Sequence, residues 1–135
     1  MNTKLRAHFA AILVLFVSSL PHAQPDSFRA LIGTWQGRVD VRSDPERALG
    51  IKSIVRKGDW WIADMHYGTT GMGLSHLSGR VNMAGDAIML TFTTSADNPA
   101  ELRLVSEREL RGTLKVRSGT GWRVDREIRL DKTSE

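Results

Sequence analysis

Apolar and polar residues alternate with a period of two along most of this chain, and this alternation limits the folds that the chain can adopt. In the segment 34–41, Trp35 and Val39 fall on one face while Gln36 and Arg38 fall on the other. This is the period of a β-strand with one buried face. The same test predicts eight strands, over residues 34–41, 49–55, 61–67, 75–83, 88–92, 102–104, 110–116 and 122–130.

Short turn sequences separate these segments, among them KGD at 57–59, AGD at 84–86 and SGTG at 118–121. Such connections are too short for helical crossovers, so we expect neighbouring strands to be antiparallel and joined in chain order. Eight strands in this order can close on themselves, which removes unpaired edges. The sequence therefore predicts an all-β fold, an eight-stranded antiparallel up-and-down β-barrel, with a two-sheet sandwich of the same strands as the alternative.

The alternation also predicts which side chains face the interior. These inward-facing residues are Trp35, Gly37, Val39, Val41, Leu49, Ile51, Ser53, Val55, Trp61, Ala63, Met65, Tyr67, Ser75, Leu77, Gly79, Val81, Met83, Ile88, Leu90, Phe92, Leu102, Leu104, Leu110, Gly112, Leu114, Val116, Trp122, Val124, Arg126, Ile128 and Leu130. Most of them are apolar, as a buried core requires.

The N-terminal segment differs in kind from the rest of the chain. Lys4 and Arg6 precede the apolar run 9–20, an order typical of a cleaved signal peptide. The run is shorter than the roughly 20 residues that a membrane-spanning helix needs. We therefore expect residues 1–23 to be a signal peptide, residues 24–135 to form one domain, and the protein to be periplasmic or secreted, with no membrane span.

A short helix is expected between this segment and the first strand. Asp26 is a candidate N-cap for a helix over residues 27–31, and Gly33 can end it with a positive φ.

Composition excludes several classes of chemistry. The chain has no cysteine, which rules out disulfides, thiol catalysis, cysteine-ligated zinc and a lipid-anchored cysteine. Its net charge of +4 falls to +2 without Lys4 and Arg6. The remaining basic residues are spread along the predicted strands rather than concentrated in a patch beside stacking aromatics, so we expect no nucleic-acid partner.

Both ends of the domain resemble a known family. The stretch LIGTWQGRV at 31–39 resembles the Gly-x-Trp motif that opens the first strand of lipocalins and related calycin barrels, here Gly33 and Trp35. The ending ELRGTLKVRSGTGWRVDREIRLDK is similar to the last two strands of small exported bacterial lipocalin-like domains. The resemblance implies that Trp35 packs under a basic side chain of the closing strand. Arg126, the only charged residue on the predicted inward face of that strand, is the candidate.

Two histidines invite a metal or haem interpretation. If the strands around Gly71 form a hairpin centred there, His66 faces His76 and both lie on the outer face. Such a pair can bind copper or zinc, but Asp64 is the only further ligand nearby apart from a loop methionine, whereas a structural site wants about four. Solvated surface histidines are the favoured interpretation. Haem is disfavoured because it requires a histidine pointing into an apolar cavity, so we expect no cofactor.

No catalytic constellation emerges. The stretch GLSHL at 73–77 lacks the final glycine of a nucleophile elbow, and no strand-to-helix unit exists to carry a dinucleotide loop. The strand carboxylates are all predicted to face outward, so none converge in a pocket: Asp40, Asp64, Glu101, Asp125, Glu127 and Asp131. We therefore expect a protein that is not an enzyme.

Two functional interpretations remain. In the first, the interior binds a small hydrophobic ligand through Trp61, Met65, Tyr67 and Phe92. In the second, the core is solid, and the barrel is a protein-interaction or inhibitor module whose loops contact a protein partner. Those loops are residues 68–73, with Met72 at the tip, and residues 95–99. A domain of this size needs most of its side chains for its core, which favours a filled interior.

Overall fold

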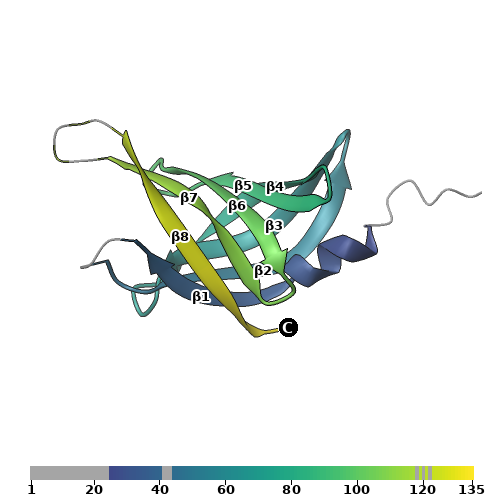
Figure 1. Cartoon of the computed structure of the whole chain (residues 1–135), viewed down its shortest axis with the longest axis horizontal. Coiled ribbons are helices and arrows are strands. Elements are labelled where there is room, and N and C mark those ends of the chain that lie inside the picture. The colour runs from purple at the N-terminus through teal and green to yellow at the C-terminus, as the bar shows by residue number, and fades with distance from the viewer. Residues whose placement is uncertain (1–24, 41–43, 118, 120, 122) are drawn as a thin grey trace, which may run out of the picture.

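The computed structural model describes residues 25–40, 44–117, 119, 121 and 123–135, and the predicted signal peptide lies outside this part of the chain. A short 3-10 helix, η1 (Asp26–Leu31), precedes the strands (Figure 1). The strands are β1 (Gly33–Val39), β2 (Arg47–Lys57), β3 (Trp60–Thr69), β4 (Leu74–Ala84), β5 (Ala87–Thr93), β6 (Pro99–Ser106), β7 (Glu109–Arg117) and β8 (Arg123–Ser134).

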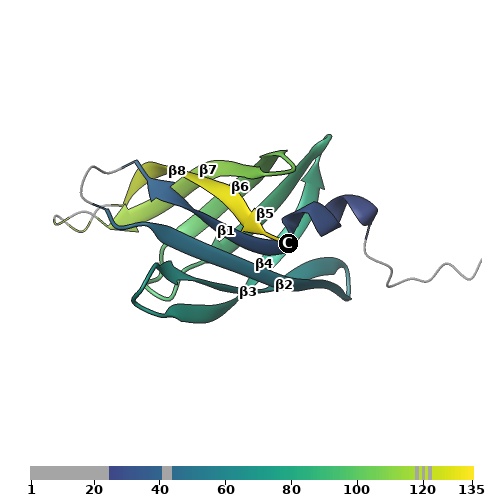
Figure 2. The same ribbon diagram turned by 90° about the horizontal axis from the view of Figure 1, so that it is seen from below.

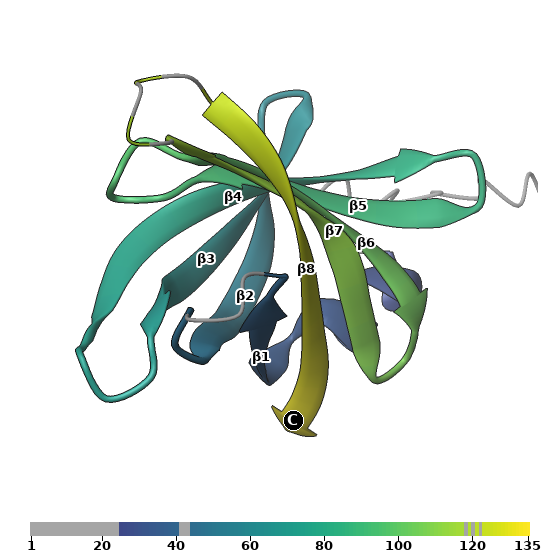
Figure 3. The same cartoon turned by 60° about the vertical axis from the view of Figure 1, so that its left-hand side comes forward.

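The eight strands form one closed antiparallel barrel in chain order. The first strand closes on the last, with Gly37 opposite Leu130 and Val39 opposite Ile128, and the ring can be followed strand by strand in Figure 3. The all-β, antiparallel, up-and-down barrel predicted from the sequence is therefore confirmed. The sandwich alternative is wrong, because β1 and β8 share one ladder instead of ending in two sheets.

Helix η1 lies at one end of the barrel, at the right of Figures 1 and 2. Its Phe28 and Leu31 are buried, and the indole Nε1 of Trp35 donates a 2.9 Å hydrogen bond to the carbonyl oxygen of Leu31. Asp26 is the first helical residue and not the predicted cap, since the helix begins directly after Pro25 without a side-chain capping bond. We call this end, which η1 covers, the closed end, and the opposite one the open end.

The middle of the barrel is a packed core. The residues with almost no exposed surface include Trp35, Leu49, Met65, Leu90, Leu102, Leu110, Ile128 and Leu130. Gly79 shows how tight the packing is, because a Cβ added there would lie 2.8 Å from Cδ1 of Leu90 and 2.9 Å from Sδ of Met65. The space beside this glycine is therefore filled by neighbouring side chains.

A β-bulge in β2 overturns two inward predictions. The pairing of β2 with β3 shifts between Ile51 and Ser53, so one extra residue enters the strand and the faces exchange. Ile54 is buried as a result, whereas Val55, predicted to face inward, is 46% exposed. The inward predictions for Ser53 and Val55 are wrong because they depend on an alternation that the inserted residue interrupts.

Met83 is also exposed, although the alternation predicts that it faces inward. It lies near the turn of the β4–β5 hairpin, which extends outward from the barrel (Figure 3). Val41 and Trp122, also predicted to face inward, lie outside the described residues.

The basic residue above Trp35 is Lys132 and not Arg126. Trp35 pairs with Lys132 in the β1–β8 ladder, and Nζ of Lys132 lies 5.4 Å from the centre of the indole ring. The same ammonium group donates a 3.0 Å hydrogen bond to the carbonyl oxygen of Ala30. Arg126 pairs with Leu114, six residues further back along β8. The prediction was wrong because it ended the last strand at residue 130, whereas β8 continues to Ser134.

Candidate functional site

Two loops meet at the open end of the barrel. The β3–β4 loop is tied to the start of β2 by Thr70, whose backbone nitrogen donates to the carbonyl oxygen of Glu46 at 2.9 Å. The β5–β6 loop is closed on itself, because Thr94 and Asn98 exchange hydrogen bonds of 2.9 and 3.1 Å. A hydrogen bond of 3.2 Å between the hydroxyls of Ser75 and Ser95 joins the two sides.

Between these loops lies a cavity of about 200 Å³, which we call the open-end cavity. Its lining residues are Arg47, Tyr67, Gly68, Thr69, Met72, Gly73, Ser75, Thr94, Ser95, Ala96, Asn98 and Leu114. The volume lies below the roughly 300–1,000 Å³ typical of pockets for drug-sized molecules. The cavity therefore suits a ligand of only a few heavy atoms or one end of a longer molecule.

Tyr67 forms the inner wall of the cavity. Its side chain is only 3% exposed, and its ring lies 5.2 Å from that of Phe92. The phenolic oxygen is buried and has no hydrogen-bond partner among the described residues. Burial raises the pKa of Tyr67 above its ordinary value of 10.0, and the nearby Arg47 guanidinium offsets part of that rise. The hydroxyl is thus a neutral donor.

Two arginines supply positive charge at this end of the barrel. Arg47 is half-buried, and its Nη2 lies 3.4 Å from the carboxylate of Asp44, but its Nε is buried without a partner. Arg126 is also half-buried, and its Nε has no hydrogen-bond partner within the described part of the chain. Its register partner Leu114 lines the cavity. An unsatisfied buried donor costs about 1–3 kcal/mol, so three such atoms at one end of a barrel need a physical reason.

Asp97 forms ion pairs with two arginines at the open end. The carboxylate of Asp97, in the β5–β6 loop, lies 3.3 Å from Arg123 and 3.7 Å from Arg117. Asp97 takes a left-handed backbone conformation with φ of 62°, which aspartate tolerates better than most residues. These contacts hold the loop against the ends of β7 and β8.

The four residues predicted to contact a ligand are not brought together. Tyr67 lines the open-end cavity and Phe92 packs against it from the side. Met65 is fully buried in the packed middle, and Trp61 lies at the closed end, with its ring 5.7 Å from that of Phe28. In contrast, the two loops predicted as a surface for a protein partner converge on this same cavity.

The sequence interpretation did not single out Arg47. That residue stands two positions before Leu49 and shares its inward parity. A second strand predicted to begin two residues earlier would have included it among the inward-facing residues. The meeting of residues 68–73 with residues 94–98 has no comparable sequence pattern, because it depends on how the barrel curves.

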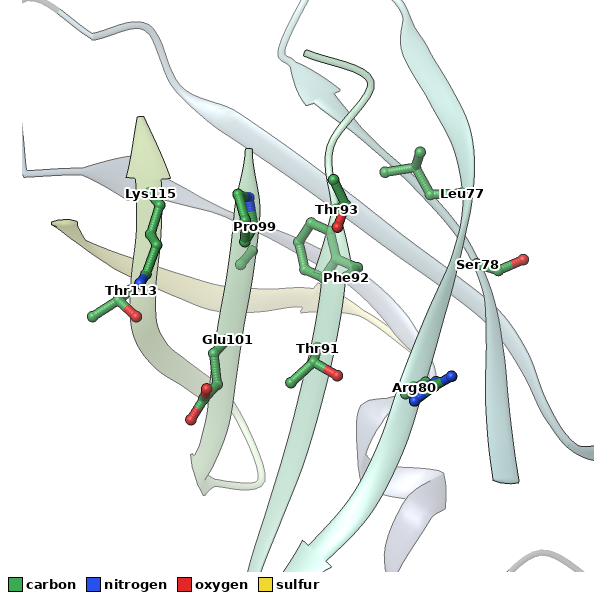
Figure 4. A pocket seen from close by; sticks show the side chains of 11 residues that line it. Leu77, Ser78, Arg80, Thr91, Phe92, Thr93, Pro99, Glu101, Thr113 and Lys115 are labelled. Atoms are coloured by element: carbon green, nitrogen blue, oxygen red, sulfur yellow. The ribbon is translucent and has the colours of Figure 1, made fainter. Parts of the chain in front are cut away.

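A second depression, an open groove of about 510 Å³, lies on the wall of the barrel over β4–β7 (Figure 4). The ladder between β4 and β5 begins at the hairpin turn and ends at the pair Arg80 and Thr91. Leu77 and Phe92 lie beyond this last pair and line the groove. The charged side chains along it, Arg80, Glu101 and Lys115, are of mixed sign and open to solvent.

The histidine hairpin has the predicted register. His66 pairs with His76, Asp64 with Ser78 and Met65 with Leu77, and the imidazole rings lie 5.0 Å apart. Nε2 of His76 is hydrogen-bonded to the carboxylate of Asp64, which lowers the pKa of Asp64. Within the described ranges, no group of three or more histidine or acidic side chains is arranged to hold a metal ion.

No family model matches the chain, and no curated protein matches it either. Among the residues that the structure describes, no helix has the length and apolar character needed to cross a membrane.

Proposed function

We propose that this chain is an exported, non-enzymatic, lipocalin-like barrel that binds one small molecule in the open-end cavity. The observation that carries the proposal is the contrast between the two parts of the barrel. The middle of the barrel is packed, whereas the open end holds a cavity lined by Tyr67 and Arg47, each of which carries a buried polar atom without a partner among the described residues. A ligand that supplies those partners accounts for their burial.

The arrangement around Trp35 supports the lipocalin-like part of the proposal. The resemblance implied a first-strand tryptophan under a basic side chain of the closing strand, and Lys132 occupies that position. The short helix that precedes β1 adds a second element to this closure, since its Leu31 carbonyl accepts the indole hydrogen bond. Because unrelated functions occur on barrels of this kind, these contacts support only the class of fold.

Native mass spectrometry tests ligand binding directly. The full-length chain, exported with its own N-terminal segment, is compared in native and denaturing conditions. An added mass that disappears on denaturation is expected, and the denatured mass also gives the site of signal cleavage. A bare protein mass under native conditions contradicts the proposal.

A pair of tryptophan substitutions locates the ligand. Ala96→Trp places a large side chain in the mouth of the cavity, whereas Ala84→Trp places the same side chain at the exposed β4–β5 turn. We expect the added mass to be lost from Ala96→Trp and kept in Ala84→Trp. Its retention in both variants would put the ligand elsewhere, for which the groove over β4–β7 is the next site to examine.

A second candidate function is a protein-interaction or inhibitor module that acts through the same loops. It is favoured by Met72, an apolar side chain that is 81% exposed at the tip of the β3–β4 loop, next to the partly exposed Leu74. Under this alternative, Met72→Asp weakens capture of a specific partner from the exported fraction, while Met83→Asp at the opposite hairpin does not. Equal capture by both variants contradicts it.

A further inference from the structure

The unpartnered donors at the open end indicate what kind of ligand fits there. We propose that the ligand is a monoanion, a carboxylate on a small apolar body, whose oxygens accept hydrogen bonds from Tyr67 and Arg47 while Arg126 supplies compensating charge. This inference depends on the proposed binding function and names the chemical class of the ligand.

The unpartnered polar atoms at the open end can all act as hydrogen-bond donors. The buried polar side-chain atoms without partners among the described residues are Nε of Arg47, Nε of Arg126 and the hydroxyl of Tyr67. Guanidinium groups only donate, and a phenol held neutral by burial offers its proton. A neutral carbonyl can accept from Tyr67 and Arg47 but brings no negative charge to offset Arg126, whereas a carboxylate supplies both the acceptor oxygens and the charge. The sign of the charge therefore favours the anion.

The charge balance separates a carboxylate from a phosphate. Arg117 and Arg123 share the single carboxylate of Asp97, which leaves one positive charge in that solvent-exposed group, and Arg47 is partly neutralised by Asp44 at 3.4 Å. Within the described ranges, Arg126 is the half-buried guanidinium on the inner face for which no acidic partner is present. Among the half-buried groups Arg47, Asp44 and Arg126, the excess positive charge is therefore close to one, which matches a carboxylate and leaves a phosphate near pH 7 partly uncompensated.

The walls of the cavity indicate the size and polarity of the rest of the ligand. Leu114 and the Tyr67 ring, backed by Phe92, give an apolar inner surface, whereas Thr94, Ser95 and Asn98 form a polar mouth. A cavity of about 200 Å³ accepts a short chain or one ring beneath such a mouth. We therefore choose hexanoate as the probe and hexanamide as its uncharged counterpart of the same shape.

Calorimetric titration of the exported protein with these two compounds tests the inference. Hexanoate is expected to bind at least about tenfold more tightly than hexanamide, because charge-assisted hydrogen bonds are stronger than neutral ones. Tyr67→Phe, Arg47→Gln and Arg126→Gln should each weaken hexanoate binding by about tenfold or more. Arg103→Gln, which removes an exposed arginine on the outer face of β6, should leave binding unchanged.

The outcomes separate the two proposals. If the native adduct is present but extraction yields a neutral compound, or if hexanamide binds as tightly as hexanoate, the anion assignment is overturned while small-molecule binding stands. The absence of both an adduct and hexanoate binding removes both proposals. Inorganic phosphate is titrated in parallel, and tighter binding of phosphate than of hexanoate contradicts the charge argument. Equal losses in Arg103→Gln and Arg47→Gln would show a non-specific charge effect and also overturn the assignment.

Discussion

Lys132 shows how much the role of one inward-facing charge depends on where its strand ends. Its ammonium group lies above the Trp35 ring and bonds the carbonyl oxygen of Ala30, so it joins β8, β1 and η1 at the closed end. Arg126 stands on the same face of β8 but at the other end of the strand, where its Nε has no partner within the described ranges. One basic residue therefore joins three elements of the fold, whereas the other keeps a buried donor without a partner.

This difference predicts opposite results for two alanine substitutions. Lys132→Ala removes a partly buried hydrogen bond and a cation–π contact and should lower the free energy of unfolding by about 1–3 kcal/mol. Arg126→Ala removes a side chain with an unsatisfied donor and should change it by less than about 1 kcal/mol. Urea unfolding followed by tryptophan fluorescence measures both values. A larger loss for Arg126→Ala than for Lys132→Ala contradicts the assignment.

Trp35 itself should be among the most sensitive positions. It is fully buried and its indole donates to Leu31, so Trp35→Ala should cost about 3–5 kcal/mol. The same unfolding experiment applies, with chemical denaturation followed by circular dichroism because a fluorophore is lost. A cost below about 1 kcal/mol would mean that the side chain is not the buried anchor described here.

Tyr67 is the only tyrosine, so its ionisation can be followed by tyrosinate absorbance without overlap from other residues. Burial raises its pKa, with Arg47 opposing and Asp44 reinforcing the rise. The folded state thus holds the phenolic proton more tightly than the unfolded chain. Its contribution to stability is fully present below the unfolded pKa of about 10 and is lost as the pH rises through the folded pKa.

We therefore expect the free energy of unfolding to fall more steeply above about pH 10 in the wild type than in Tyr67→Phe. At neutral pH the variant should be as stable as the wild type or up to about 1 kcal/mol more stable, because the hydroxyl that it loses has no partner. Urea unfolding at a series of pH values checks this. Parallel profiles for the two proteins would show that Tyr67 ionises as in the unfolded chain.

At the scale of elements, the bulge in β2 decides which of two neighbouring side chains enters the core. Ile54→Ala should cost about 2–5 kcal/mol, whereas Val55→Ala should cost less than about 0.5 kcal/mol. Thermal unfolding of the two variants distinguishes them. A larger cost for Val55→Ala than for Ile54→Ala would mean that the alternation continues without interruption and that β2 has no bulge.

The contrast between β2 and the β3–β4 hairpin explains how much of the fold was predictable. The register that sets His66 against His76 follows from a turn centred on Gly71, because a short turn fixes every pair along both strands. The bulge in β2 has no such local pattern. Lys52, between Ile51 and Ser53, fits the alternation as an outward-facing polar residue, so nothing in the sequence marks the inserted residue. Strand number, order and most inward faces were therefore predictable, but interruptions within a strand were not.

The site was predictable only in part for a related reason. Tyr67 and the inward parity of Arg126 follow from alternation alone, and the two loops are predicted from the sequence as a surface for a protein partner. Their convergence on one cavity depends on the closure of the barrel and on the contact between Ser75 and Ser95, two residues far apart in the chain. Pairing rules for neighbouring strands do not describe such contacts.

On the scale of the whole molecule, the barrel is divided along its axis into a filled part and an open end. The filled part is fixed by the β1–β8 ladder, the helix η1 and the packing of Met65 and Leu90 beside Gly79. The open end is built from loops, and residues 74–79 of β4 lie outside the register pairs with β5. Segments with few backbone partners open more easily than a packed core, so stability is expected to be uneven along the barrel axis.

Hydrogen–deuterium exchange can detect this division and its response to an anion. In the free protein, amides of β1, β8 and the first half of β3 should exchange most slowly, and those of residues 69–79 and 94–98 most quickly. Saturating hexanoate should slow exchange in the two fast segments by at least about tenfold while leaving the slow strands unchanged, because a ligand stabilises only the opening events that release it. Hexanamide at the same concentration is the control. Uniform slowing along the chain would indicate binding away from the loops, since only a ligand held between them couples their opening to its own release.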